Sequence, residues 1–260
     1  MKKIIYFEQW LAIAFSFITL LFWYFTYRYG CFSLFIPIFI VVLLTCQLYK
    51  YSEIQKKCFA DVYFNPKSLV YRLLTGKKII AIRAFAYGVF LTLILILGVS
   101  TFSFMDFLTL LMSGLVTIFI FNKYSRKMLC FNEKIRPESV KILSIYIGSI
   151  LCTVFYIAYN FALPPPDYIQ LSLSDTVNIA SNQVSSNCHI IDTVLRWTNE
   201  ISAIKTWMLL GFTMKTNAVA PSAMWSFVLL FIWILHFIGS FLIFMSFNRY
   251  TLQLTFLFKK

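Results

Sequence analysis

Cysteine is the residue type in this chain with the most varied chemistry, because a thiolate can act as a nucleophile, bind a metal ion or form a disulfide. No two of them have Cys-x-x-Cys spacing. Neither a zinc site nor a dithiol redox motif is therefore indicated. The six are Cys31, Cys46, Cys58, Cys130, Cys152 and Cys188.

A serine and a histidine within apolar stretches could act as nucleophile and base. Ser113-Gly114 and His236-Phe237-Ile238-Gly239 resemble elements of the rhomboid intramembrane proteases, which place them in the fourth and sixth of six spans. Leu111, however, stands where the Gly-x-Ser-Gly motif has its first glycine. The sequence also has no His/Asn set for an oxyanion site. An intramembrane serine protease is thus the third hypothesis, and we assign no catalytic residue.

Asp106 and His236 are ionisable residues in or beside apolar stretches, where such groups are costly and commonly functional. They are the candidate polar sites of a small-solute or ion transporter, provided that they line one cavity. The sequence contains no paired carboxylates, phosphate-binding glycine loop or metal-ligand cluster. We therefore expect no cofactor, no metal and no enzymatic activity.

Composition indicates the elements that would position these residues. The chain is 60% hydrophobic and only 13% charged, with a mean hydropathy of +0.78. Soluble domains carry about 25% charged residues. We expect a single all-α membrane domain, residues 1–260, with six transmembrane helices. The predicted spans cover about 9–27, 32–49, 79–99, 101–121, 142–163 and 222–247.

The basic residues test this arrangement separately from hydropathy. Of the 23 Lys and Arg, two stand at the N-terminus, eight in residues 50–83, six in 122–141 and three in the C-terminal tail. The other four are Arg28, Arg196, Lys205 and Lys215. Basic loops mark the cytoplasmic side, so both termini are predicted to be cytoplasmic. The net charge of +13 is explained in the same way, and nucleic-acid binding is not expected.

Residues 164–221 form the predicted extracytoplasmic segment between spans five and six. Its first part alternates weakly as a strand over 168–174 and then becomes a Ser/Asn-rich loop over 175–187. A helix is predicted at about 190–214, because apolar residues recur there at steps of three and four. They give this helix its predicted docking or assembly face: Ile190, Val194, Trp197, Ile201, Ile204 and Met208.

The position of this helix resembles the layout of tetrameric cation channels, which have an outer helix between the last two spans. The run Leu210-Gly211-Phe212-Thr213-Met214 does not match a potassium filter, so potassium selectivity is not expected. The same topology places only Cys31 and Cys188 on the oxidising side. These two cysteines are a candidate disulfide, with free buried thiols as the alternative.

The leading hypothesis is a non-enzymatic multi-pass protein of the cell membrane, such as a bacterial inner membrane. It would act as an oligomeric channel-like element, sensor or scaffold in defence, immunity or secretion, with a small-solute or ion transporter as the alternative. The expected partners are membrane lipid, further copies of the chain, and a cytosolic or membrane protein. The predicted contacts are the basic inner residues Lys56, Lys57, Lys77, Lys78, Lys123, Arg126 and Lys127.

Overall fold

The computed structural model describes residues 2–55, 63, 65, 67–71, 76–125, 136–162, 169, 172–215 and 223–258. Within this part of the chain every secondary-structure element is a helix. The elements are α1 Lys2–Thr26, η1 Cys31–Leu34, α2 Phe35–Gln55, α5 Lys77–Ser100, α6 Phe104–Ser125, α7 Arg136–Ala162, α8 Leu173–Asn182, α9 His189–Lys215 and α10 Ala223–Phe258.

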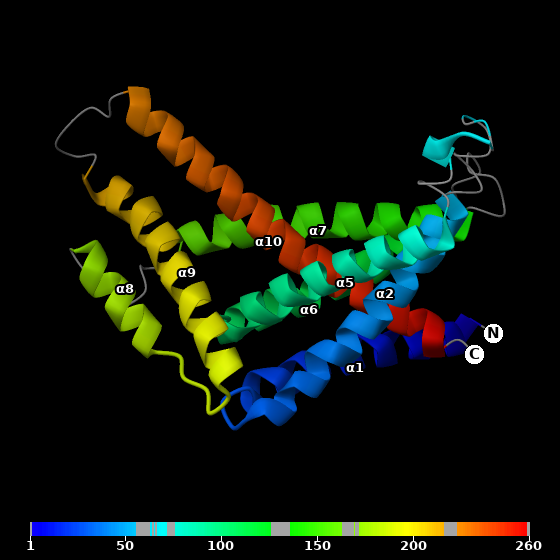
Figure 1. Ribbon diagram of the computed structural model, residues 1–260, viewed down its shortest axis with the longest axis horizontal. Coiled ribbons are helices and arrows are strands. Elements are labelled where there is room, and N and C mark those ends of the chain that lie inside the picture. The colour runs from blue at the N-terminus through cyan, green and yellow to red at the C-terminus, as the bar shows by residue number, and fades with distance from the viewer. Residues whose placement is uncertain are drawn as a thin grey trace.

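Six of these helices are long and apolar enough to cross a membrane. The chain is thus compatible with a multi-pass membrane protein, as its composition predicts. The candidate spans are Phe7–Thr26, Cys31–Glu53, Lys77–Ser100, Phe104–Ser125, Ser139–Asn160 and Leu230–Phe258. Both termini lie at one end of the bundle, which we call the terminal end, and α8 and α9 lie at the other, the hairpin end (Figure 1).

Small residues let two pairs of helices approach closely. Gly88 of α5 lies against Thr45 of α2, and a Cβ at Gly88 would be 3.3 Å from the Thr45 backbone nitrogen. Gly148 of α7 lies against Thr117 of α6, where an added Cβ would be 3.2 Å from the Thr117 Cα. The α2–α5 and α6–α7 pairs therefore pack backbone against backbone.

Helix α10 is the central element, because it packs against α1, α2, α5, α6 and α7. It extends for 36 residues and ends at Phe258, whereas we expected the last span to end at Phe247. Its segment from Phe244 to Thr255 is buried throughout. The part of the chain expected to be a short basic tail is thus the most enclosed stretch of the bundle.

The first part of the predicted extracytoplasmic segment differs from our expectation. We expected a loop over 175–187, but α8 occupies residues 173–182. Ser172 caps this helix: its side chain accepts a hydrogen bond from the Asp175 N–H at 3.1 Å. The spacing of Ser172 and Asp175 is that of a helix N-cap signal, which the Ser/Asn-rich composition obscured. Helices α8 and α9 then pack side by side as a hairpin (Figure 1).

Candidate functional site

The buried segment of α10 is unusually polar for a membrane span. Six of its polar side chains are at most 6% exposed although they point in different directions around the helix. They are buried because α10 is surrounded by other helices, each covering one side. Unpaired polar groups are costly in such a setting, so their partners define the site. The six are Ser246, Asn248, Arg249, Thr251, Gln253 and Thr255.

Asn248 joins three helices through its amide. Its Nδ2 donates to Ser113 Oγ of α6 at 2.8 Å and to Ser149 Oγ of α7 at 2.9 Å. The Ser113 hydroxyl also lies 3.1 Å from Asn248 Oδ1. All three side chains are fully buried. This network gives Ser113 a structural partner.

The same contact separates Ser113 from His236. His236 and Asn248 are twelve positions apart on one continuous helix, which at 1.5 Å per residue is about 18 Å. A nucleophile and its base must lie within hydrogen-bond reach. The rhomboid-like serine and histidine therefore do not form a catalytic pair in this structure.

Two cationic side chains lie at the α7–α10 interface. Lys141 is 2% exposed and Arg249 is 4% exposed. Lys141 Nζ lies 3.3 Å from Gln253 Oε1 and 4.4 Å from the centroid of the Phe256 ring. The Arg249 guanidinium carbon lies 5.9 Å from the centroid of the Tyr146 ring, and its Nε has no hydrogen-bond partner.

Further polar pairs connect α1 to the same region. Ser16 Oγ and Thr251 Oγ1 are 2.9 Å apart. Gln9 and Asn122 exchange two amide hydrogen bonds of 2.8 and 2.7 Å between α1 and α6, nearer the terminal end. The polar interior thus includes side chains from four helices, and we call it the polar seam. Its residues are Gln9 and Ser16 of α1, Ser113 and Asn122 of α6, Lys141 and Ser149 of α7, and Asn248, Arg249, Thr251 and Gln253 of α10.

The structure does not bring the two predicted polar candidates together. Asp106 closes a capping box at the start of α6: its Oδ2 accepts the Ser103 N–H at 2.7 Å, and Ser103 Oγ accepts the Asp106 N–H at 3.4 Å. His236 is half-buried on α10, in edge contact with Trp233. Lys205 of α9 lies close enough to interact electrostatically with this imidazole, and burial lowers the pKa of the Lys205 amine.

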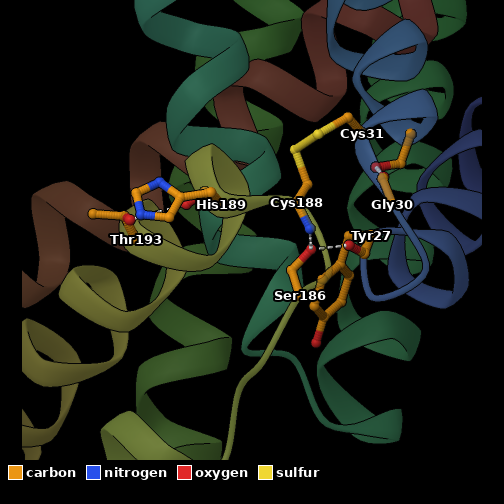
Figure 2. Close-up of a disulfide and its surroundings, with 8 residues drawn as sticks. Tyr27, Gly30, Cys31, Ser186, Cys188, His189 and Thr193 are labelled. Atoms are coloured by element: carbon orange, nitrogen blue, oxygen red, sulfur yellow. Dashed lines mark hydrogen bonds between the residues drawn. A yellow bond between two sulfur atoms is a disulfide. The ribbon is translucent and has the colours of Figure 1, made fainter.

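Cys31 and Cys188, the two cysteines that topology places together, form a disulfide in the structure (Figure 2). It attaches the start of α9 to the turn between α1 and α2. Ser186 reinforces the attachment, because its hydroxyl donates to the Tyr27 carbonyl and accepts the Cys188 N–H (Figure 2). The Asn187 N–H also donates to the Arg28 carbonyl at 3.1 Å.

Asp192 stabilises the first turn of α9. Its carboxylate accepts the Ser186 N–H at 2.9 Å and the Arg196 Nε–H at 2.8 Å. These two donors, the Ser186 amide first, hold the pKa of Asp192 below its usual 3.8. The hairpin is therefore held by one covalent and several polar contacts.

The predicted docking face of α9 points away from the rest of the chain. Ile190, Trp197 and Ile201 are each more than 60% exposed, and Met208 is 36% exposed; Val194 and Ile204 are partly covered. The neighbouring face packs inward instead, through Ile191, Leu195, Ala203 and Leu209. Both faces are apolar at helical spacing, so periodicity alone could not tell which one is buried.

The predicted basic contacts are only partly within the described residues. Lys77 and Lys78 at the start of α5 and Lys123 near the end of α6 are exposed. Lys56, Lys57, Arg126 and Lys127 lie outside the described residues. In the part of the chain that the structure describes, no three His, Cys, Asp or Glu side chains gather as a metal site.

Of the polar seam, sequence reasoning singled out Ser113, as a possible nucleophile, and missed the residues of α10 and Lys141. The sequence pattern assigns Lys141 to a basic loop and Asn248, Arg249 and Gln253 to a tail. The available signal was the return of apolar residues after Arg249, at Leu252, Leu254 and Phe256 to Phe258.

Comparison of the chain with protein-family models, curated proteins and solved structures finds no match.

Proposed function

We propose that this chain is a multi-pass protein of the cell membrane that transports a small solute or ion through the polar seam. The observation that carries the proposal is that α10 buries Arg249 along with amide and hydroxyl side chains that bond to α1, α6 and α7. Ionisable groups inside a membrane span are costly, and they commonly mark ion or solute pathways.

The alternative of a purely structural bundle accounts less well for these residues. Helices in lipid associate through close packing of small residues, as at Gly88 and Gly148. That packing needs no buried cation. Under this proposal the terminal end, with the exposed Lys77, Lys78 and Lys123, faces the cytoplasm and anionic lipid.

The proposal is tested by flux through the purified chain in lipid vesicles. Electrical recording on a solid-supported membrane, with a panel of small anions, cations and protons, should show a current for one class. Arg249→Gln should abolish this current, whereas Arg83→Gln, at an exposed site on α5, should leave it unchanged. Absence of current for the whole panel, or an equal loss in both variants, would refute transport through the seam.

A second candidate, an oligomeric or membrane-docked scaffold, is favoured by the exposed apolar face of α9. Trp197 and Ile201 would be poorly placed in water, and they suit either the outer membrane surface or another copy of the chain. Trp197→Glu should lower the oligomer mass in detergent or release α9 from the vesicle surface, and Gln183→Glu on the exposed side of the hairpin should do neither. Unchanged mass and unchanged docking in Trp197→Glu would exclude this role.

A further inference from the structure

The disulfide presents its two cysteines unequally to solvent. Cys31 is exposed, whereas Cys188 is 1% exposed. Cys31 is the first residue of its candidate span, so it lies at the end of the span and not in the middle of the hydrocarbon. The polar residues nearest to the two cysteines along the chain, Arg28, Asn187 and His189, are exposed as well. A thiol in solution therefore approaches the pair from the Cys31 side.

Hydrogen bonds that do not involve sulfur also hold the two cysteines together. The Ser186 hydroxyl donates to the Tyr27 carbonyl and accepts the Cys188 N–H (Figure 2). The Asn187 N–H donates to the Arg28 carbonyl at 3.1 Å. These bonds join the residues just before Cys188 to the turn just before Cys31, so they keep the cysteines adjacent when the S–S bond is broken.

Helix α9 is itself docked on the bundle by its apolar inner face. Ile191 and Leu195, in its first two turns, are 5% and 2% exposed and belong to the hydrophobic core. The Cys188 carbonyl accepts the Asp192 N–H at 2.8 Å, which fixes Cys188 to the first turn of α9. A reduced Cys188 would therefore stay in place, with its thiol facing Cys31.

We propose that Cys31 and Cys188 are a site of thiol–disulfide exchange with a dithiol partner. A thiolate of the partner attacks the Cys31 sulfur, the S–S bond breaks, and Cys188 leaves as a thiolate that takes up a proton. The second thiolate of the partner then attacks the partner's own sulfur in the mixed disulfide and releases Cys31. Two electrons and two protons pass from the dithiol to the cysteine pair, and the partner becomes a disulfide. This inference goes beyond the transport proposal and does not depend on it.

The fixed position of Cys188 selects a dithiol over a monothiol. After a monothiol has attacked Cys31, the Cys188 thiolate lies beside the mixed disulfide and expels the monothiol in an intramolecular step, which proximity favours. A dithiol has an intramolecular step of its own, and that step completes the reduction before Cys188 can reverse it. Cys31 is thus the attacked cysteine and Cys188 the resolving one.

The reaction is measured on the full chain in a neutral detergent, after its free thiols have been blocked with N-ethylmaleimide. The probes are reduced glutathione, a monothiol, and dithiothreitol, a dithiol, at equal thiol concentration. Acid stops the exchange, isotopically heavy N-ethylmaleimide labels the new thiols, and peptide mass spectrometry locates both modifications. We expect glutathione on Cys31 with the heavy label on Cys188, and after dithiothreitol the heavy label on both. Circular dichroism should show that the chain stays folded throughout.

Two neighbouring serines test whether the pair is held in position. Ser186→Ala should lower the equilibrium constant for forming the disulfide in a glutathione redox buffer about threefold to tenfold, because a hydrogen bond that keeps the cysteines adjacent is lost. Ser185→Ala removes an exposed hydroxyl one residue away and should leave the constant unchanged. Equal constants in the two variants would refute the resolving role of Cys188.

Three further results would overturn the exchange site. The first is glutathione on Cys188 in place of Cys31. The second is new thiols that appear only where circular dichroism shows unfolding, which would make the disulfide purely structural. The third is equal reduction by glutathione and dithiothreitol at equal thiol concentration, since a resolving Cys188 should make the dithiol at least about tenfold more effective.

Discussion

Replacing Gly148 by alanine tests whether α6 and α7 pack backbone against backbone. The added Cβ would lie 2.1 Å from Thr117 Oγ1, 3.1 Å from its Cβ and 3.2 Å from its Cα. Rotation of the hydroxyl relieves the first contact without losing a hydrogen bond, because Thr117 Oγ1 has no partner. The other two contacts involve atoms that cannot rotate away, so the helices must separate by about half an ångström to reach ordinary carbon contact distances.

Such overpacking costs about 1–3 kcal/mol. Alanine also has a higher helix propensity than glycine, which stabilises the helix by up to about 1 kcal/mol and would partly mask the cost of overpacking. Gly239→Ala on α10 is the matched control, because a Cβ there meets nothing within 4 Å. We therefore expect Gly148→Ala to be less stable than Gly239→Ala by about 1–3 kcal/mol.

The assay is reversible unfolding in mixed detergent micelles, followed by circular dichroism. Thr117→Ala should recover part of the loss in the Gly148→Ala background, with a coupling of at least about 0.5 kcal/mol. Equal stabilities of Gly148→Ala and Gly239→Ala, together with strict additivity in the double variant, would show that α6 and α7 do not meet at this position.

Three further predictions use the same unfolding assay. Cys188→Ser should lower the free energy of unfolding by about 2–4 kcal/mol, since the disulfide closes a loop of 157 residues, and a reductant should then have no further effect. Asn248→Ala should cost about 1–2 kcal/mol by leaving two buried serine hydroxyls unpaired, and a neutral result would contradict the hydrogen-bond network. Asp192 has a lowered pKa in the folded state, so its stabilising contribution is complete above pH 3.8 and is lost as the pH falls further. Asp192→Asn should remove that part of the acid sensitivity, and an unchanged pH profile would exclude it.

Local pattern was sufficient for the six candidate spans. Hydropathy sums over about 20 residues, so each span is recognised without knowing its neighbours. The six candidate spans and the all-helical described chain follow from that property. The pairing of Cys31 with Cys188 could also be proposed, because the alternation of basic loops restricts which cysteines share one side.

Burial inside the bundle could not be predicted in this way, because it depends on partners distant in sequence. Lys141 and Gln253 are 112 residues apart, and Ser113 and Asn248 are 135 apart. The sequence pattern assigns Arg249 to a basic tail, although α1, α2, α5, α6 and α7 pack against the helix that carries it and its side chain is buried.

The two apolar faces of α9 illustrate the same limit. Periodicity indicates that both Ile190 and Ile191 begin an apolar row, but only contact with α8 and the bundle decides that Ile191 is buried and Ile190 exposed. By itself the sequence determined the six candidate spans, since hydropathy depends on residues close together along the chain, but it indicated neither α8 nor the full length of α10. The tertiary structure decided which side chains face each other, because that depends on how the helices pack, and so it alone revealed the polar seam and its buried arginine.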